Sequence, residues 1–573
     1  MAHEDKAITN TVDGGEAILQ AFRNLGIDYV ISSPGSEWAP FWEALARQKS
    51  NGTPGPTYID CGHETLAVNM ALGYTQMTGR MQAVLLHAGT GLLQGSMAIH
   101  GATVTEVPMI VMSGEALSYG EDPDYEPGTQ WIRSLSVVGG PQRLVDPLVK
   151  WANQATSVHT IYQSTVRAGE MAQRLPKGPT YLCMPMETMM ENWTPPAGMK
   201  AVAPPSIVEA SSADVDKIAA LILSAKTPMI TTEAVGRDPD AFHALVTLAD
   251  LMAIPVVEGR GMSHANFPKE HPLYLGGGAP GALLKQADLV IVLASRVPFY
   301  PARNAPTDKT IVVISDNPHK SFMVYQDLHA DHYLEGDVAS SLQRLTEALA
   351  RAGATAARYQ ERRAHWHSEH DRIVEALRAE EAKAPQTGLV DPLTLCVCLR
   401  EIMPSDTIYI DETVVYGNIV QTHLPWSVPQ SFFRTPTGLG QALGMGLGVK
   451  LAASDRPVVV LTGDGSFLYN PSLAAFGASK ANKLPILAII FNNREYKSMK
   501  RNHLALYPGG LAKQTGIHFG NKVDSLDYAE IAKAFGGFGR RVDDAADLAK
   551  ALKDALAAVN AGQTAILDVV MAR

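Results

Sequence analysis

The chain contains 573 residues, and its 58 acidic and 48 basic side chains give a formal net charge of −10 at pH 7. This balance, without any block of Lys or Arg, does not suggest a surface that binds nucleic acid. With 46% hydrophobic and 18% charged residues, the composition is that of a soluble globular protein, and the length predicts several domains. There is no cationic leader before an apolar run and no apolar stretch of about 18 residues, so we expect a cytoplasmic protein without membrane contact.

The first part of the sequence alternates helix-like and strand-like segments. Strand-like runs such as YVISSPG, MQAVLLHAGTG, VPMIVMSGE and GPTYLCMPME are interspersed with amphipathic stretches such as EAILQAFRNLG. This alternation is typical of a parallel sheet with helices on its faces. We therefore predict an N-terminal α/β domain over residues 1–191, followed by a proline-rich linker over residues 192–205.

Two further α/β regions follow the linker. Residues 206–348 contain the runs TPMITTEAVG, ADLVIVLAS and KTIVVISDN, without the GxGxxG fingerprint that would indicate a dinucleotide. The charged, alanine-rich residues 349–386 are predicted to form a connecting helix, and the alternation restarts over residues 387–573. The predicted fold is thus α/β, with three doubly wound parallel-sheet domains. Residues 502–522 lack strong periodicity, so they are interpreted either as a moving lid or as a plain surface loop.

Polar groups end two neighbouring strand-like segments near the C-terminus. The strand predicted over 457–462 runs into the Gly-Asp-Gly turn 463–465, and the strand predicted over 485–491 ends in paired asparagines. The carboxyl ends of parallel strands share one edge of a sheet, so Asp464 and Asn493 are expected to lie together at a ligand site. Oxygen ligands of this kind suit Mg²⁺, and glycine N–H groups can face an anion. These residues therefore predict a site for a magnesium-bound diphosphate.

The Gly-Asp-Gly turn and the asparagine pair together make a more specific motif than either alone. Residues 466–491, which number 26, separate them. In this arrangement the chain resembles the thiamine diphosphate-dependent superfamily of pyruvate decarboxylase, acetolactate synthase and benzoylformate decarboxylase, over essentially its whole length. The resemblance implies an N-terminal pyrimidine-binding domain, a central α/β domain and a C-terminal diphosphate-binding domain. It also implies thiamine diphosphate and Mg²⁺ as cofactors; FAD, found in some relatives, has no support in the sequence but is not ruled out by it.

The resemblance also assigns the residues that hold these cofactors. Asp464, Asn493 and the main chain of Glu495 would bind the magnesium ion. Leu439 matches the apolar wedge that bends the cofactor, with Thr437 and Gly438 beside the pyrimidine. The remaining residues implied to contact the cofactor are Gly463, Gly465, Ser466, Tyr496 and Glu64.

Three catalytic residues follow from motifs that resemble the benzoylformate decarboxylase branch. Glu64, in CGHETLAVNMALGYTQMTG, matches the glutamate that acts on the aminopyrimidine from a neighbouring subunit. Ser36, in SPGSEWAPF, would bind the substrate carboxylate or carbonyl. His87, in LLHAGTGLLQG, would transfer protons to and from the substrate adduct, and it follows Glu64 by 23 residues as in that branch.

Departures from the branch leave the reaction open. The second histidine of benzoylformate decarboxylase has no visible counterpart, and Val414 and Val415 replace hydroxyl residues. Ser498 and Asn502 stand where relatives have apolar or aromatic groups, which favours a more polar substrate than benzoylformate.

We interpret the protein as a decarboxylase of a 2-oxo acid that releases an aldehyde or passes the resulting enamine to an acceptor carbonyl. The alternative is an acyloin (2-hydroxy ketone) lyase or carboligase without decarboxylation. A non-catalytic cofactor-binding paralogue is disfavoured because Glu64, Asp464 and Asn493 are all present. Family membership further implies self-association to a dimer or tetramer, with a small-molecule 2-oxo acid, 2-hydroxy ketone or aldehyde as substrate and no nucleic acid or membrane partner.

Overall fold

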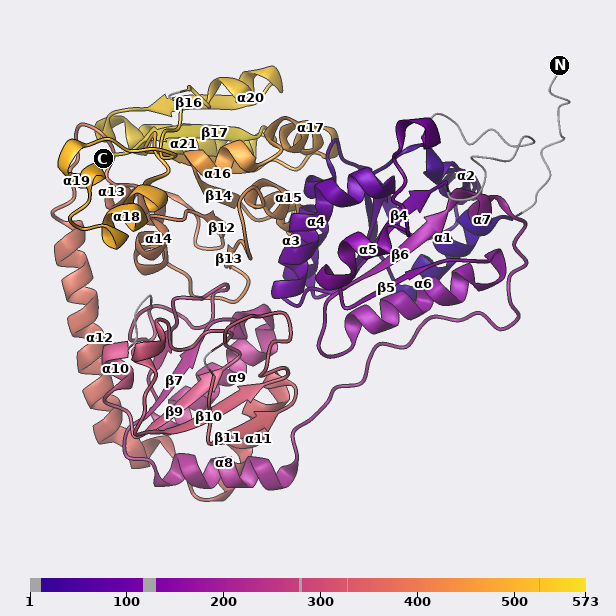
Figure 1. Ribbon diagram of the computed structural model, residues 1–573. Helices are drawn as coiled ribbons and strands as arrows, with labels where there is room; N and C mark the ends of the chain where they lie inside the picture. Colours follow the sequence, from indigo (N-terminus) through magenta and orange to yellow (C-terminus); the bar gives the residue numbers. More distant parts are fainter. Residues whose placement is uncertain (1–11, 117–129, 278–280, 327, 525, 573) are drawn as a thin grey trace, which may run out of the picture. The chain divides into compact units, whose positions relative to one another are not determined.

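The structure is a computed structural model that describes residues 12–116, 130–277, 281–326, 328–524 and 526–572 (Figure 1). The chain divides into two compact units, one ending at Ser206 and the other beginning at Ile207. Among the described residues the strands form three parallel sheets flanked by helices, which confirms the predicted α/β class. No helix within the described ranges is long and apolar enough to cross a membrane.

The first unit is built on a six-stranded parallel sheet with the order β2-β1-β3-β4-β6-β5. Because the order reverses at β1, the carboxyl ends of β1 and β3 lie at a topological switch point, where ligands of open α/β sheets usually bind. The strands are β1 (Tyr29–Ser33), β2 (Thr57–Asp60), β3 (Gln82–His87), β4 (Met109–Glu115), β5 (Trp151–Gln154) and β6 (Pro179–Pro185).

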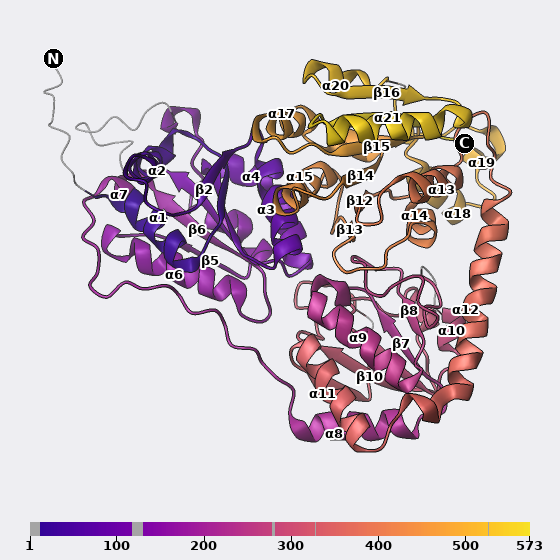
Figure 2. The same cartoon turned by 180° about the vertical axis from the view of Figure 1, so that it is seen from behind.

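Helices cover both faces of this first sheet (Figures 1 and 2). α1, α2 and α6 pack on one face around Leu85 and Met112, while α3 and α4 pack against each other and against β1, β3 and β4. Burial on both faces explains why the strands read as continuous apolar runs. The helices are α1 (Gly14–Leu25), α2 (Ala39–Asn51), α3 (Glu64–Thr78), α4 (Ala88–Val104), α5 (Gln142–Val145), α6 (Val158–Gln173) and α7 (Met186–Met190).

The second unit begins with a five-stranded parallel sheet of order β11-β10-β9-β7-β8. Its strands are β7 (Pro228–Thr232), β8 (Val256–Glu258), β9 (Leu289–Leu293), β10 (Thr310–Ser315) and β11 (His332–Glu335). Its helices are α8 (Ser212–Ser224), α9 (Pro239–Met252), α10 (Gly281–Leu284) and α11 (Val338–Arg351).

The connecting region differs from the single helix predicted over residues 349–386. α11 ends at Arg351, and α12 spans only Gln360–Glu381. Between them Gly353 adopts a left-handed conformation with φ of 84°, which interrupts the helix. The charged composition is therefore divided between two helices and the turn that separates them.

A second six-stranded parallel sheet completes this unit, in the order β13-β12-β14-β15-β17-β16. Its strands are β12 (Ile408–Glu412), β13 (Phe432–Arg434), β14 (Val458–Gly463), β15 (Leu487–Asn492), β16 (Phe538–Val542) and β17 (Ala565–Val570). Its helices are α13 (Pro392–Ile402), α14 (Gly417–His423), α15 (Ala442–Ala452), α16 (Asp464–Tyr469), α17 (Ser472–Asn482), α18 (Lys497–Leu506), α19 (Leu511–Thr515), α20 (Glu530–Ala534) and α21 (Leu548–Asn560). The segment predicted to be irregular, 502–522, thus contains the end of α18 and all of α19.

Glu381, the last residue of α12, joins three helices of the second unit. Its carboxylate pairs with Arg400 of α13 at 2.7 and 2.8 Å, with His423 of α14 at 2.8 Å, and with Arg378 at 2.7 Å. Burial acts to raise the pKa of Glu381, but the hydrogen bonds from Arg400, His423 and Arg378 lower it to about 2. We call Glu381, Arg378, Arg400 and His423 the α12 joint.

Candidate functional site

The second unit brings the predicted magnesium ligands together. β14 and β15 are neighbours with Gly463 opposite Phe491, so Asp464 and Asn493 follow adjacent strand ends. The Arg494 N–H donates to Asp464 Oδ2 at 2.6 Å and links the two ends directly. Asp464 is 2% exposed and Asn493 is 6% exposed.

The Asp464 carboxylate is suited to a cation. Burial raises its pKa to about 6, and the backbone N–H groups of Gly465 and Arg494 offset this only in part. Among the described residues it makes no ion pair, so a bound divalent cation would provide the charge that the protein does not. The Glu495 side chain pairs with Lys500 at 3.0 Å, which leaves the main chain of Glu495 as the group available to a metal.

Asn493 is held in a fixed orientation. Its Oδ1 accepts the Glu495 N–H at 2.8 Å, and its Nδ2 donates to the Tyr416 hydroxyl at 3.2 Å. These two contacts assign the amide oxygen and nitrogen, and the oxygen keeps a second lone pair that could bind a cation.

The Gly-Asp-Gly turn is packed closely against Tyr496. Gly463 caps α16, and Ser466 is 4% exposed within it. A Cβ added at Gly465 would overlap the Tyr496 ring, so glycine is required for this contact. The turn therefore packs directly against Tyr496, the residue that precedes α18.

The predicted wedge residue lies between two left-handed glycines. Gly438 and Gly440 have φ of 65° and 89°, and Leu439 between them is partly exposed. The Thr437 N–H donates to Gln441 Oε1 at 3.3 Å. This loop can therefore present an apolar side chain and backbone groups together, as the wedge assignment requires.

Glu412, at the end of β12, fixes this loop and is absent from the sequence-based assignments. It is 3% exposed; its Oε1 accepts the Gln441 N–H at 2.8 Å and its Oε2 accepts Asn470 Nδ2 at 2.8 Å. Burial raises the pKa of Glu412 to about 7. The sequence could have indicated Glu412, because this carboxyl ends a predicted strand in the DETVV segment.

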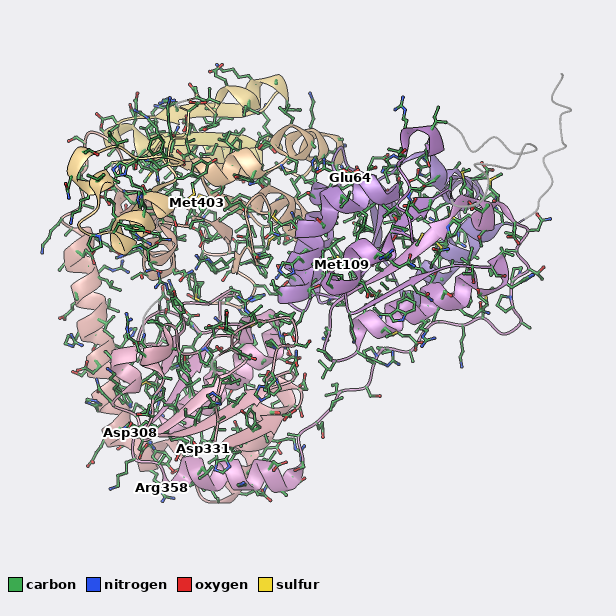
Figure 3. The ribbon with its side chains drawn as sticks, viewed as in Figure 1. Glu64, Met109, Asp308, Asp331, Arg358 and Met403 are labelled. Atoms are coloured by element: carbon green, nitrogen blue, oxygen red, sulfur yellow. The ribbon has the colours of Figure 1, made fainter. Side chains whose placement is uncertain are left out.

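In the first unit, Glu64 is the first residue of α3 (Figure 3). It lies near His87: a Cβ added at Gly91 would stand 3.0 Å from Glu64 Oε1 and 3.1 Å from His87 Cβ. The structure thus brings two of the three predicted catalytic residues together beside the first turn of α4.

His87 is the last residue of β3, and its ring forms a hydrogen bond with Glu37. Its Nδ1 lies 3.0 Å from Glu37 Oε1 and 3.1 Å from Glu37 Oε2, and its side chain is 26% exposed. The hydrogen bond with Glu37 raises the pKa of His87; burial acts in the opposite direction, and the charges of Glu64 and Glu115 add to the increase.

Ser36 belongs to the same cluster through Gln130. Gln130 Nε2 donates to Ser36 Oγ at 3.1 Å and to Glu37 Oε2 at 2.8 Å. The sequence-based assignments included neither Glu37 nor Gln130. The position of Glu37 directly after Ser36 was a usable signal, whereas nothing in the sequence places Gln130, 94 residues away, beside Ser36.

Three family models match the chain in succession. The thiamine pyrophosphate enzyme N-terminal TPP binding domain matches residues 12–136, the central domain matches residues 215–345, and the C-terminal TPP binding domain matches residues 416–569. Their order agrees with the three predicted sheets.

Similar proteins catalyse several reactions. Benzoylformate decarboxylase of Pseudomonas aeruginosa is 25% identical, covering 95% of this chain and 96% of its own. Sulfoacetaldehyde acetyltransferase of Rhodobacter capsulatus is 26% identical, covering 97% and 94%, and 2-hydroxyacyl-CoA lyase 2 of Danio rerio is 23% identical, covering 98% and 92%.

Solved structures agree on the fold. The thiamine diphosphate-dependent 4-hydroxybenzoylformate decarboxylase of Rhodococcus jostii RHA1 superposes with a TM-score of 0.81 at 23% identity, covering 98% of this chain and 99% of its own. With three matching family models and relatives aligned over nearly the full length, the chain belongs to the thiamine pyrophosphate enzyme family.

Proposed function

We propose that the protein is a thiamine diphosphate- and Mg²⁺-dependent decarboxylase of a 2-oxo acid, which releases an aldehyde or transfers the remaining fragment to an acceptor carbonyl. The observation that supports this most directly is the position of His87 beside Glu64 at the switch-point edge of the first sheet. Such an arrangement provides two proton-transferring groups next to each other, as carbon–carbon bond cleavage beside a carbonyl requires.

The cofactor would be held by groups from the strand ends of the second unit. Asp464, Asn493 and the Glu495 carbonyl would bind Mg²⁺, the turn at 463–466 would accept the diphosphate, and Tyr496 would flank it. Leu439 would support the bent cofactor, with Thr437 and Gly438 facing the pyrimidine. When bound, thiamine diphosphate supplies the electron sink for the bond that breaks.

Residues of the first unit would perform the proton transfers. Glu64 would exchange a proton with the aminopyrimidine. Ser36 Oγ, oriented by Gln130, would bind the substrate carboxylate or carbonyl. His87 would donate a proton to the product and take one from the substrate adduct; its hydrogen bond with Glu37, which raises its pKa, favours the protonated ring that donates.

A second candidate function is acyloin lyase or carboligase activity without decarboxylation. It is favoured by the presence of one histidine, His87, in the described part of the Ser36 cluster, where Gln130 provides a neutral amide instead of a second titratable group. The acetyltransferase and lyase among the relatives are consistent with it.

The test is to reconstitute apo-protein with thiamine diphosphate and Mg²⁺ and to screen 2-oxo acids, aldehydes and acyloins for CO₂ and for carbonyl products. We expect CO₂ release from at least one 2-oxo acid, and a loss of at least about 100-fold in Glu64→Gln because general acid–base catalysis contributes that much. The panel pairs aromatic with polar 2-oxo acids, because Ser498 favours a polar substrate; a clear preference for the aromatic acid would contradict that choice.

Each outcome of the screen decides between the candidates. Carbonyl products without CO₂ would favour the lyase or carboligase. Unchanged activity in Glu64→Gln would contradict the role given to Glu64 in both candidates, and no product from any substrate would leave cofactor binding without this chemistry. Glu16→Gln, which removes a carboxylate paired with Arg23 and Arg47 and outside the contacts described for Ser36, Glu37 and His87, is the matched control and should retain activity.

A further inference from the structure

We propose that Glu37 is a positioning residue that holds the His87 ring with Nδ1 bound to the Glu37 carboxylate, so that Nε2 is the nitrogen that exchanges protons with the substrate. The proposal rests on the proposed function of His87 and extends it to a residue that does not itself meet the substrate.

The contacts of Glu37 define one orientation of the His87 ring. Both Glu37 oxygens approach Nδ1, and Oε1 also accepts the Ala88 N–H at 3.1 Å. Gln130 Nε2 donates to Oε2. An ionised carboxylate can only accept hydrogen bonds, so Nδ1 must carry a proton, and neutral His87 then has its lone pair at Nε2. No described residue forms a hydrogen bond with Nε2.

Glycines on both sides leave room for this pair. A Cβ added at Gly35 would overlap His87 Nδ1 and Glu37 Oε2, and one added at Gly114 would overlap Glu37 Cγ. Gly114 stands directly opposite His87 in the register of β3 and β4. The Glu37 side chain is 0% exposed, so it reaches the substrate only through His87.

The charged groups that influence the pKa of His87 are all acidic. Glu37 follows β1, Glu64 begins α3 and Glu115 ends β4. Glu37 is in hydrogen-bond contact and has the largest effect on the pKa of His87. Removing this carboxylate should therefore lower the pKa of the imidazole more than any other single change.

A purely structural role makes a different prediction. Glu37 also fastens the turn after β1 to Ala88, and the amide oxygen of Glu37→Gln can keep that bond. The amide oxygen at the Oε1 position also stays within reach of Nδ1, which lies 3.0 Å from Oε1, but the amide has no negative charge to stabilise the protonated ring. Glu37→Gln thus preserves the packing while removing the charge beside His87.

The experiment measures the His87 imidazole directly in the full-length chain with isotope-labelled histidine. His87→Asn assigns its signals, and pH titrations are compared for wild type, Glu37→Gln, Glu37→Asp and the control Glu16→Gln. We expect neutral His87 in wild type to be the Nδ1–H tautomer, and its pKa to fall by about 1–3 units in Glu37→Gln. Glu37→Asp should keep the tautomer and part of the increase, and Glu16→Gln should match wild type.

A neutral Nε2–H tautomer in wild type, or an unchanged pKa of His87 in folded Glu37→Gln, would overturn the inference. If Glu37→Gln does not fold, Glu37→Asp decides by the same signals, and failure of both to fold would identify Glu37 as structural only. The titration needs no substrate. An activity screen that gives no product would therefore count against the proposed function and not against the interaction of Glu37 with His87. In active enzyme, the loss of kcat/KM at high pH should begin about 1–3 units lower in Glu37→Gln.

Discussion

Glu115 is a buried carboxyl at the end of β4, in the sheet that carries His87. Burial raises its pKa from 4.5 to about 7, and the charge of Glu37 acts in the same direction. Between these pH values the folded state holds the proton more tightly than the unfolded state does. The free energy of unfolding therefore falls as the pH rises through this range.

We predict that Glu115→Gln flattens this pH dependence. Wild type should lose up to about 3 kcal/mol of stability between pH 4.5 and 7 through this group, because a pKa difference of one unit corresponds to about 1.4 kcal/mol. Urea unfolding of both proteins at several pH values would measure it. Parallel stability curves for wild type and Glu115→Gln would show that Glu115 does not titrate in this range.

The candidate site residues that were predicted from the sequence lie in local motifs, whereas those that were missed depend on contacts between distant parts of the chain. Asp464, Asn493 and Glu64 sit in contiguous motifs whose strand or helix ends can be read locally. Glu37 and Gln130 act through contacts across 50 residues or more in the chain. A sequence shows that a carboxylate is present, but not that its strand and loop bury it against a particular histidine.

Among the secondary-structure elements, α12 depends on the α12 joint at its last residue. Glu381 carries a charge that three cationic or potentially cationic groups share, so its removal leaves Arg400 and His423 without their common partner. The joint connects α12 to α13 and α14. It thereby links the connecting region to the helices of the last sheet.

We predict that Glu381→Ala lowers the free energy of unfolding of the second unit by roughly 3–5 kcal/mol, the usual effect of removing one partner from a buried ion pair. The exposed neighbour Glu380→Ala, on the same helix, is the control and should change little. Since the folded pKa of Glu381 is lowered to about 2, its contribution is present above pH 4.5 and is lost as the pH falls toward 2. Equal urea midpoints for the two variants at pH 7 would contradict this role.

Element order was largely predictable, whereas interruptions were not. Apolar runs correctly indicated β14 and β15, with ends one or two residues from those predicted. The break at Gly353 and the short helices α18 and α19 escaped prediction because composition alone does not show where a charged segment turns. The domain boundaries at 191, 205, 348 and 386 stay predictions.

In the whole molecule, the same strand order occurs twice. The sheet of the first unit, β2-β1-β3-β4-β6-β5, and the last sheet, β13-β12-β14-β15-β17-β16, correspond strand by strand. In each, polar residues follow the strands at the reversal point: Ser36 and His87 in one, Asp464 in the other. The two sets of proposed site residues thus occupy equivalent positions in two similar sheets.

We predict that these two sets of residues together form one site, with the two halves coming from different subunits of a dimer or tetramer. Glu64→Gln and Asp464→Asn should each be inactive, but mixed dimers would contain one site with both residues intact. Refolding the two variants together at equal amounts should restore roughly a quarter of wild-type activity, since half of the dimers are mixed and each has one working site of two. Sedimentation should give two or four times 61.5 kDa.

Activity of the mixture no greater than that of the separate variants would place both halves on one chain. Mixing two Glu64→Gln preparations that carry different tags is the control for refolding. It should stay inactive whichever subunit provides each half.

The glycines at 35 and 114 change how related genes should be compared. A homologue that retains Ser36, Glu37 and His87 but has alanine at either glycine would pass any alignment of reactive side chains. Its added methyl group would nevertheless occupy the space of the Glu37–His87 pair. Two positions without a side chain therefore belong to the signature of the proposed Glu37–His87 pair, and genome surveys that score only functional groups would overlook them.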